Sequence, residues 1–373
     1  MAPGQRRKRS ARFIEIAVEA GVSASTVDRV LNERGSASDK ARRKVIAAAQ
    51  RLGVPRILPS AAHELIHVDI LLPDNRTPFF LRLRGALARA CSILDKRIAI
   101  HRRIVRETDE RSLVQAIIKP TYPRRGLIIA APDTQAVRKA LEGAFDRGEA
   151  VVTVVSNVAD VPGIAYFGID NYRAGRTAGF IMGRFARRAG RVMFLSGRND
   201  YAARQQRTAG CRDALNTSFQ NLHCDTSSFE TLDDDYRCFV AVAEAMRSTD
   251  LAGIYNSGAG SAGIKRALEQ SDPEYGVTWI THELSDDHRQ YLLSGALAMI
   301  IDQDPDMQAT MALRYLVQRL DSNAGKTSGM SGCEFHLYFS ENVKEGRYLS
   351  ARDLSADHRP ATRSCGWTGS EKR

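Results

Sequence analysis

Residues 13–32 read FIEIAVEAGVSASTVDRVLN, and this stretch decides the fold at the start of the chain. Apolar residues recur at helical spacing through Ala20, stop at Gly21 and resume at Val27. Glycine can adopt the positive φ that a tight turn between two helices requires. Ser23 follows the turn at the place where a hydroxyl can accept a hydrogen bond from the free amides of a second helix. The stretch therefore predicts two short helices packed across a turn.

Residues 38–53, SDKARRKVIAAAQRLG, predict a third helix with Ser38 as its N-cap and one apolar stripe. Together the three helices predict an all-α helix–turn–helix unit over residues 13–54, preceded by a basic arm at 1–12. Residues 1–60 carry 13 Lys and Arg against 5 Asp and Glu, so most of the net charge of +11 lies there. This charge favours a DNA-binding unit over the alternative, a helical dimerisation hairpin, because a compact cationic patch attracts polyanions.

Composition sets bounds on the rest of the molecule. The chain has 373 residues, 43% hydrophobic and 26% charged, as expected for a globular protein of two or three structural units. No stretch reaches the roughly 18 unbroken apolar residues of a membrane-spanning helix. The basic N-terminus leads into no hydrophobic signal-peptide core, and the six cysteines include no CxxC pair. We therefore expect a cytoplasmic protein with reduced thiols.

From residue 66 onward, short apolar runs alternate with longer amphipathic stretches. The strand-like runs are 67–73, 98–105, 126–132, 151–156, 166–170, 191–197, 251–256, 277–282 and 297–302. The helix-like stretches are 78–95, 110–119, 134–147, 171–189, 202–218, 233–248, 260–270, 286–294 and 305–321. This alternation predicts an α/β architecture with parallel sheets covered by helices on both faces, and about nine strands suit two sheets better than one. Ligands of such sheets bind beyond the carboxyl ends of the strands.

Polar and aromatic side chains follow these runs with regularity. The polar ones are Asp74, Asn75, Asp133, Ser156, Asn157, Asp170, Asn171, Arg204, Arg207, Asn256, Glu283 and Gln303. Helix capping accounts for about half of such positions, but it explains the adjacent Phe79 and Phe80, and Gln303, poorly. A sugar ring needs paired donors and acceptors for its hydroxyls and an aromatic face for its C–H groups. The pattern therefore indicates a site for a sugar or polyol.

The segments AVEAGVSASTVDRVLN (17–32) and SASDKARRKVIAAAQRLG (36–53) resemble the DNA-binding headpiece of the lactose-repressor (LacI) family of bacterial regulators. The resemblance implies that the second helix lies in the major groove. There Ala24, Ser25 and Arg29 would face bases, with Arg29 as the reader of a guanine. The residues that the resemblance places at phosphates are Ser23, Thr26, Asn32, Ser38, Lys40 and Arg42.

Two features depart from the family's pattern. Asp28 stands where many members have serine, so its carboxylate must pair with a cation or reach a cytosine amine. The family's hinge, which enters the minor groove, corresponds here to residues 55–65. In this hinge Pro55 and Pro59 flank Leu58, the candidate wedge residue.

Residues 66–322 look like the periplasmic sugar-binding-protein fold that LacI-family regulators use as an effector domain. The segments that carry this resemblance are TPFF (77–80), AAPDTQAV (130–137), GIDNYRAGRTAG (168–179), AARQQRTAG (202–210), YNSGAGSAG (255–263) and DQDP (302–305). The resemblance implies a two-lobed type I fold in an effector-binding domain at 66–352. Its N-lobe would comprise about 66–160 and 303–322, and its C-lobe about 161–302 and 323–350. We expect a disordered tail at 353–373.

The same resemblance implies a ligand site between the lobes. Phe79 and Phe80 would sandwich the sugar ring. The complete ligand-binding set is Asn75, Phe79, Phe80, Asp133, Arg204, Arg207, Asn256, Glu283 and Gln303. Glu283 replaces the family's usual aspartate, which makes the pocket tighter there by one methylene.

Two motifs point instead to enzymes. HELIH (63–67) spells the HExxH zinc-protease motif, but Pro59 and the strand-like run that follows leave no room for the long helix it needs. GAGSAG (258–263) spells GxGxxG between a strand and a helix, which is the dinucleotide-binding fingerprint. Its position late in the chain argues against that function. The rival hypothesis is nevertheless an NAD(P)-dependent Rossmann-type enzyme.

The sequence as a whole predicts a LacI-type transcriptional regulator. We expect no catalytic residues, metal or cofactor, and no membrane partner. Operator DNA and a small-molecule effector, a sugar or polyol, are the expected partners, and the effector would act allosterically. A homodimer is expected because one headpiece offers too little surface for tight specific binding, whereas two read paired half-sites.

Overall fold

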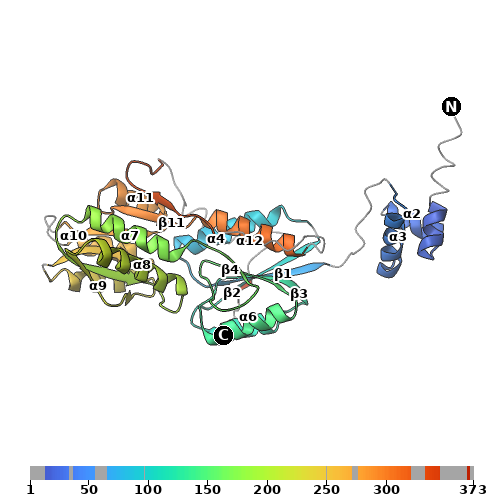
Figure 1. The fold of residues 1–373 in the computed structure, drawn as a ribbon, viewed down its shortest axis with the longest axis horizontal. Coiled ribbons are helices and arrows are strands. Elements are labelled where there is room, and N and C mark those ends of the chain that lie inside the picture. The colour runs from blue at the N-terminus through green and yellow to red at the C-terminus, as the bar shows by residue number, and fades with distance from the viewer. Residues whose placement is uncertain are drawn as a thin grey trace, which may run out of the picture. The chain divides into compact units, whose positions relative to one another are not determined.

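The computed structural model describes residues 13–32, 37–54, 65–95, 97–248, 250–270, 276–320, 332–344 and 368–369. They belong to two units, Met1–Ile66 and His67–Arg373 (Figure 1). The predicted basic arm at 1–12 and the predicted hinge, apart from Leu65, lie outside the described residues.

The first unit is a small helical bundle. Residues 13–20 are helical, and α2 (Ala24–Leu31) and α3 (Asp39–Arg51) follow. Gly21 has φ +62°, and the Ser23 hydroxyl accepts from the Thr26 amide at 3.2 Å as the N-cap of α2. Ser38 accepts from the Ala41 amide at 3.3 Å at the start of α3. The helices close over a shared apolar core that includes Ile16, Val27, Val30, Leu31, Val45 and Ile46. The predicted turn and both caps are confirmed.

The second unit contains two sheets, as predicted. The first has the strand order β13-β2-β1-β3-β4-β5. Its strands are β1 (Ile66–Pro73), β2 (Ile98–Val105), β3 (Arg124–Ile129), β4 (Ala150–Val154), β5 (Ala165–Phe167) and β13 (Thr368–Gly369). Its helices are α4 (Pro78–Ser92), α5 (Glu110–Ile118), α6 (Gln135–Asp146) and α12 (Pro305–Leu320). We call this half the N-lobe.

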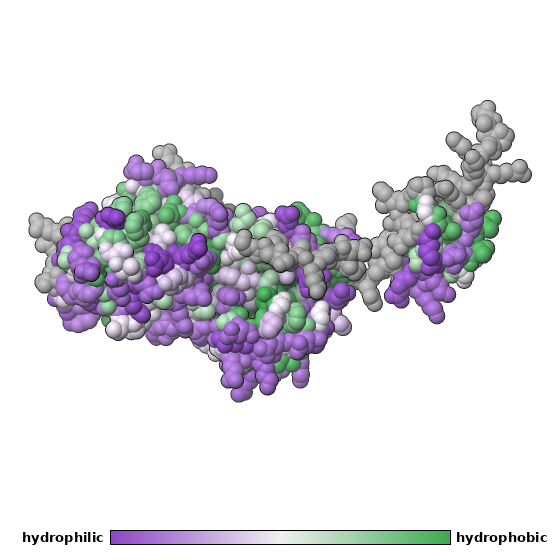
Figure 2. Space-filling view, viewed as in Figure 1, coloured by the Kyte–Doolittle hydropathy of each residue, from purple (hydrophilic) through white to green (hydrophobic). Residues whose placement is uncertain are grey.

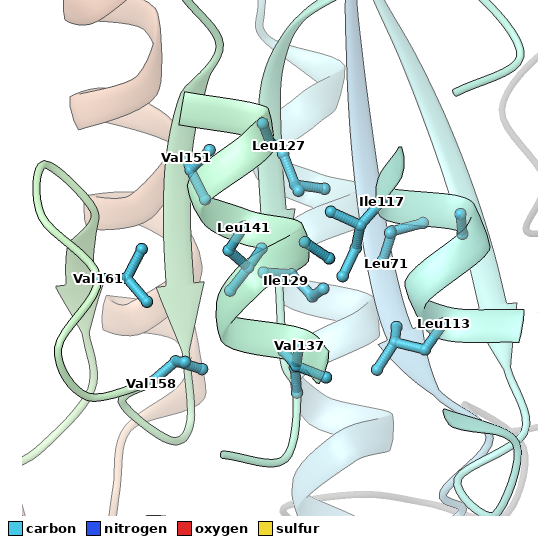
Figure 3. Packing of buried hydrophobic residues seen from close by; sticks show 14 of the residues in the cluster. Leu71, Leu113, Ile117, Leu127, Ile129, Val137, Leu141, Val151, Val158 and Val161 are labelled. Atoms are coloured by element: carbon cyan, nitrogen blue, oxygen red, sulfur yellow. The ribbon is translucent and has the colours of Figure 1, made fainter. Parts of the chain in front are cut away.

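Each face of the N-lobe sheet is covered by two helices. On one face, Leu71, Leu127 and Ile129 of the strands pack against Ile117 of α5 and Leu141 of α6 (Figure 3). On the other face, α12 lies against β3, β4 and β5 and beside α4 (Figure 1). Helices on both faces are what the βα alternation predicted.

The second sheet has the order β12-β11-β10-β9-β6-β7, with β8 paired to β6. Its strands are β6 (Gly190–Ser196), β7 (Leu222–Cys224), β8 (Phe229–Glu230), β9 (Leu251–Asn256), β10 (Thr278–His282), β11 (Met299–Asp302) and β12 (His336–Tyr338). Its helices are α7 (Asn171–Phe185), α8 (Ala202–Ser218), α9 (Asp235–Ala245), α10 (Ser261–Glu269) and α11 (Asp286–Leu293). We call this half the C-lobe.

Glycines allow α7 and α8 to lie almost in backbone contact. A Cβ added at Gly175 would lie 2.0 Å from the backbone oxygen of Arg207, and one at Gly179 would lie 2.5 Å from that of Cys211. Any larger residue at these two positions would push the helices apart. Because α8 carries Arg204 and Arg207, this packing determines where their guanidinium groups lie.

The lobe boundaries differ in part from the prediction. β5 at 165–167 extends the N-lobe sheet, so the expected boundary near residue 160 is too early. The return to the N-lobe after β11 and the placement of β12 in the C-lobe agree with expectation. Of the tail at 353–373, the structure describes only Thr368 and Gly369, which pair with β2 rather than lying unstructured.

Hydrophilic side chains cover most of the visible face of the second unit, with smaller hydrophobic patches between them (Figure 2). Within the described ranges, no helix is both long enough and apolar enough to cross a bilayer.

Candidate functional site

A cavity of about 470 Å³ lies between the two lobes of the second unit. It is lined by the loop after β1 and the start of α4 from the N-lobe, and by loops after β6, β8, β9, β10 and β11 from the C-lobe. It is therefore at the carboxyl ends of strands, where the sequence predicted a ligand site. The predicted residues that line it are Asn75, Phe79, Phe80, Arg204, Arg207, Glu283 and Gln303.

Asp133 is not among the residues that line the cavity, and its predicted contact with a ligand stays a prediction. Its carboxylate accepts from Arg138 Nε at 2.6 Å and from a second guanidinium nitrogen at 2.9 Å. Its backbone amide donates to the carbonyl of Asp200 at 3.0 Å, which joins the two lobes. The charge-assisted hydrogen bonds between this carboxylate and Arg138 are stronger than a hydrogen bond to a neutral ligand hydroxyl.

Asn256 also lies outside the cavity lining. Its side chain is fully buried, donates to Ala259 O at 3.1 Å and accepts from the Gly258 amide at 3.0 Å. Asn256 therefore shapes the loop that follows β9. The loop itself, residues 257–260, does line the cavity.

Phe79 and Phe80 reach the cavity from the first turn of α4, but they do not form the predicted sandwich. Their ring centroids are 5.4 Å apart and their planes cross at 83°. Two rings in edge contact leave no space for a sugar ring between them. Both side chains are among the residues that line the cavity from the N-lobe side.

Arg204 and Arg207 enter from α8 and are held by the C-lobe. Both donate to Ser257 O, Arg207 at 3.2 Å. Arg207 Nε also donates to Asn171 Oδ1 at 2.8 Å, and burial lowers its pKa. Arg204 pairs with Asp233 at 3.4 Å. These guanidinium groups are therefore preorganised rather than free to follow a ligand.

Glu283 and Gln303 form the innermost polar pair of the cavity. Gln303 Nε2 donates to Glu283 Oε1, while Glu283 Oε2 and Gln303 Oε1 have no hydrogen-bond partner among the described residues. Burial, and next the negative charge of Asp302, raise the pKa of Glu283 to about 7. Glu283 also has φ +71°, a conformation that costs free energy in a residue with a side chain. Strain and unmet hydrogen bonds at one point make this pair a candidate for contact with a ligand.

Sequence reasoning missed several lining residues, among them Glu107 and Asp233. Asn75 Nδ2 lies 3.3 Å from both the Glu107 and the Asp233 carboxylates, so one amide joins the lobes across the cavity. Burial, and to a lesser extent the charge of Asp233, raise the pKa of Glu107. Glu107 follows β2, so the strand-end rule could have found it. Asp233 follows β8, and a strand of two residues is too short to show an alternating hydrophobic pattern in the sequence, so the strand-end rule could not have found it.

The headpiece presents part of the predicted DNA-reading set at its surface. Ala24, Ser25 and Arg29 are exposed on α2, and Arg29 donates to Ser25 Oγ at 3.4 Å. The Asp28 carboxylate accepts a hydrogen bond from the Asn32 side-chain amide, which is neither of the two partners that the sequence suggested, a cation or a cytosine amine. The remaining predicted phosphate contacts at the surface or partly exposed are Ser23, Thr26, Asn32, Ser38 and Lys40.

Arg42 is the exception in this set. It is only 3% exposed within α3, so its predicted phosphate contact is wrong for this structure. Lys40, two residues earlier, is exposed. The phosphate contact predicted for Lys40 stays a prediction.

The glycines of GAGSAG serve packing within the C-lobe. A Cβ at Gly260 would lie 2.3 Å from Cys238 Sγ, and one at Gly263 would lie 1.8 Å from the carbonyl oxygen of Asp235. The small residues of the motif thus let helix α10 pack closely against helix α9 of the C-lobe. The fold does not support a dinucleotide site. His67 of HELIH lies on β1 and not on a helix. Within the part of the chain that is described, no three His, Cys, Asp or Glu side chains gather as metal ligands would.

Two families match the chain. Residues 13–54 match the bacterial regulatory proteins of the lacI family, and residues 70–326 match the periplasmic binding protein domain. A ribose operon repressor of Lactococcus lactis subsp. lactis is 41% identical over 78 residues, 19% of this chain and 23% of that protein. A D-ribose/D-allose-binding protein of Pseudomonas aeruginosa is 26% identical over 191 residues, 48% of this chain and 60% of that protein. The chain thus spans about a quarter to three fifths of the length of these relatives.

Among solved structures, a glucose-galactose binding protein from Geobacillus stearothermophilus aligns with a TM-score of 0.66 at 18% identity. The alignment covers 74% of this chain and 99% of that one, and at this identity it shows the fold alone. Neither matching family is described as an enzyme family. The match to the periplasmic binding protein domain covers more than half of the chain, so the chain belongs to that family, and its residues 13–54 carry a match to the bacterial regulatory proteins of the lacI family.

Proposed function

We propose that this protein is a transcriptional regulator whose operator binding is modulated by a sugar or polyol in the cavity between the lobes. The observation that carries the proposal is the pairing in one chain of an exposed recognition helix with a preorganised, partly unsatisfied polar cavity. The similar ribose operon repressor supports the proposed DNA binding, and the similar D-ribose/D-allose-binding protein supports the proposed binding of a sugar. We further propose that the protein acts as a cytoplasmic homodimer and catalyses no reaction.

The contacts between the lobes supply the means of regulation. Asn75 of the N-lobe donates to Asp233 of the C-lobe at 3.3 Å, and Arg82 of α4 pairs with Asp302 of β11 at 2.6 Å. A ligand that bridges Glu283 and the aromatic surface at Phe79 would add to these contacts and favour the closed lobes. The population of DNA-competent dimers would then shift by the ligand's differential affinity for the two states.

Operator selection tests the DNA half of the proposal. The full chain is used to select duplexes from a randomised pool, and the affinity of the enriched sequence is measured by fluorescence anisotropy at several salt concentrations. We expect a two-fold symmetric sequence bound at least about 1,000-fold more tightly than random DNA. Enrichment of no sequence would refute the assignment.

The effector half is tested by a thermal-shift screen with sugars and polyols, followed by calorimetry and by anisotropy with and without the best ligand. Arg204→Ala should weaken that ligand by about 30- to 150-fold, because it leaves buried polar groups unpaired. Arg173→Ala is the matched control, since its side chain is 80% exposed and is not part of the cavity lining. A ligand that binds the cavity but leaves operator affinity unchanged contradicts the regulatory link.

A further inference from the structure

Two histidines on neighbouring strands of the N-lobe sheet lie in direct contact. His67 is on β1 and His101 is on β2, and His67 Nδ1 lies 2.8 Å from His101 Nε2. His67 is the last residue of the HELIH motif, but its partner is 34 residues away in the chain and on a strand. No local spacing in the sequence points to this pair, because only the sheet brings its two members together.

The ring of Tyr122, which precedes β3, stacks on both histidine rings. Its centroid lies 4.8 Å from that of His67 and 4.6 Å from that of His101, with 11° and 22° between the ring planes. Tyr122 is 47% exposed and both histidines are partly exposed, so the cluster is within reach of solvent. The stacking holds the two imidazoles in place, so binding of a ligand to them costs little further side-chain entropy.

The contact between the two nitrogens contains one proton and one lone pair. A hydrogen bond between imidazole nitrogens requires a protonated donor and an unprotonated acceptor. If a metal ion takes the place of this proton, which passes to water, both nitrogens direct a lone pair at the ion. Imidazole nitrogens are the ligands that copper, nickel and zinc ions take in proteins. The pair therefore has the donor atoms of a transition-metal site.

The distance between the nitrogens favours one coordination geometry. With metal–nitrogen bonds of about 2.0–2.1 Å, two ligands at a right angle are about 2.8–3.0 Å apart, and two at a tetrahedral angle are about 3.3–3.4 Å apart. The 2.8 Å between His67 Nδ1 and His101 Nε2 fits the right angle. Right angles between neighbouring ligands are typical of Cu²⁺ and Ni²⁺, whereas structural Zn²⁺ sites are tetrahedral.

A carboxylate beside the pair also favours a cation. Asp69 follows His67 by two residues and is on the same face of β1, because side chains alternate along a strand. Burial lowers the pKa of His101, and the charge of Asp69 opposes this effect, so the carboxylate stabilises positive charge at the ring. Arg124 holds Asp69 at 3.0 Å and shares its own charge with Glu149, which lies 2.6 Å from it.

We propose that His67 and His101 bind one Cu²⁺ or Ni²⁺ ion, with water completing its coordination. Water is required because, in the part of the chain that the structure describes, no third His, Cys, Asp or Glu gathers with the pair. Neither histidine lines the cavity between the lobes, so this inference does not depend on the proposed effector site. The ion would join β1 to β2 at the strand by which the chain enters the second unit.

Calorimetry of the full-length protein without a polyhistidine tag tests the proposal, with nickel, zinc and magnesium chlorides as titrants. Ni²⁺ is the probe because Cu²⁺ also reacts with free thiols, which this chain contains. We expect one Ni²⁺ to bind with a dissociation constant below about 100 μM, Zn²⁺ to bind more weakly, and Mg²⁺, which prefers oxygen ligands, not to bind. No binding of Ni²⁺ at about 1 mM, or tighter binding of Zn²⁺ than of Ni²⁺, would overturn the proposal.

Variants show whether the two histidines are the ligands. His67→Ala and His101→Ala should each weaken Ni²⁺ binding at least about tenfold, since the loss of a residue that only supports a ligand already costs that much. His101→Gln serves if an alanine variant fails to fold, because glutamine can hydrogen-bond His67 without providing an imidazole.

The matched control is His223→Ala on β7, because His223 is 64% exposed and lies 3.6 Å from a carboxylate oxygen of Asp250, as an adventitious metal ligand would. This variant should bind Ni²⁺ as the wild type does. Unchanged binding in the folded His67 and His101 variants, or an equal loss in His223→Ala, would show that Ni²⁺ binds elsewhere and would overturn the proposal.

Discussion

Replacing Glu283 with glutamine tests whether the cavity holds an unfavourable charge when no ligand is bound. Burial and then Asp302 raise the pKa of Glu283 from 4.5 to about 7 in the folded protein. Because one pH unit of pKa difference corresponds to about 1.4 kcal/mol, ionised Glu283 lowers the unfolding free energy by roughly 3 kcal/mol relative to the protonated acid. The stabilisation that protonated Glu283 gives relative to the ionised form is fully present below pH 4.5 and is lost as the pH rises through about 7, since the folded pKa is the higher one.

Glutamine has the shape of glutamate and can still accept from Gln303, but it carries no charge. We therefore expect Glu283→Gln to exceed the wild type in unfolding free energy by about 1 kcal/mol or less near pH ~5 and by about 3 kcal/mol near pH ~8. Urea unfolding is followed by the fluorescence of Trp279, which is fully buried in the C-lobe core, with Trp367 replaced by phenylalanine in every protein.

Other groups also titrate across this range, so the informative quantity is the difference between variant and wild type at each pH. The exposed Glu142 of α6 supplies the control, because Glu142→Gln should give a difference that does not change with pH. A difference for Glu283→Gln that is equal at both pH values, or a variant less stable than the wild type near pH ~8, would refute the reasoning.

The remaining predictions concern packing and DNA. Gly175→Ala should lower the unfolding free energy of the effector unit by about 1–3 kcal/mol or more in urea titrations, because its Cβ would lie 2.0 Å from the backbone oxygen of Arg207. Arg29→Ala should relax base preference at one operator position by about 1–3 kcal/mol, measured with a set of single-base operator variants; equal weakening on every sequence would contradict base reading. Lys40→Ala should weaken binding to all sequences and reduce the slope of log affinity against log salt by about one. Arg42→Ala should leave that slope unchanged and lower the melting temperature of the headpiece, since Arg42 is buried.

Local patterns were sufficient to predict most elements of the fold. α8 has the predicted bounds of 202–218, and α7 begins at Asn171 as predicted. Helices and buried strands of this length carry a clear period, and their caps are local residues. β7, β8 and β12 escaped prediction because strands of two or three residues have too few alternations to stand out, and they are stabilised by neighbours distant in sequence.

The place of the cavity also followed from the sequence, because parallel strands bring their carboxyl ends to one edge whatever their order. Asn75, Arg204 and Gln303 were found in this way and do line the cavity. The strand-end rule identifies which residues lie near the carboxyl edge of a sheet. It does not predict the direction in which each side chain points.

The orientation of each side chain and its hydrogen-bond or ion-pair partner depended on the tertiary structure. The sequence by itself determined a helix–turn–helix headpiece, a two-sheet α/β domain and a polar cavity at the strand ends, since these depend on periodicity and turn chemistry along the chain. Only the tertiary structure decided that Asp133 pairs with Arg138 and that Arg42 is buried. The physical reason is that a charge or hydroxyl takes the partner that is nearest in space and shielded from water, and neither distance nor shielding is a property of the local sequence.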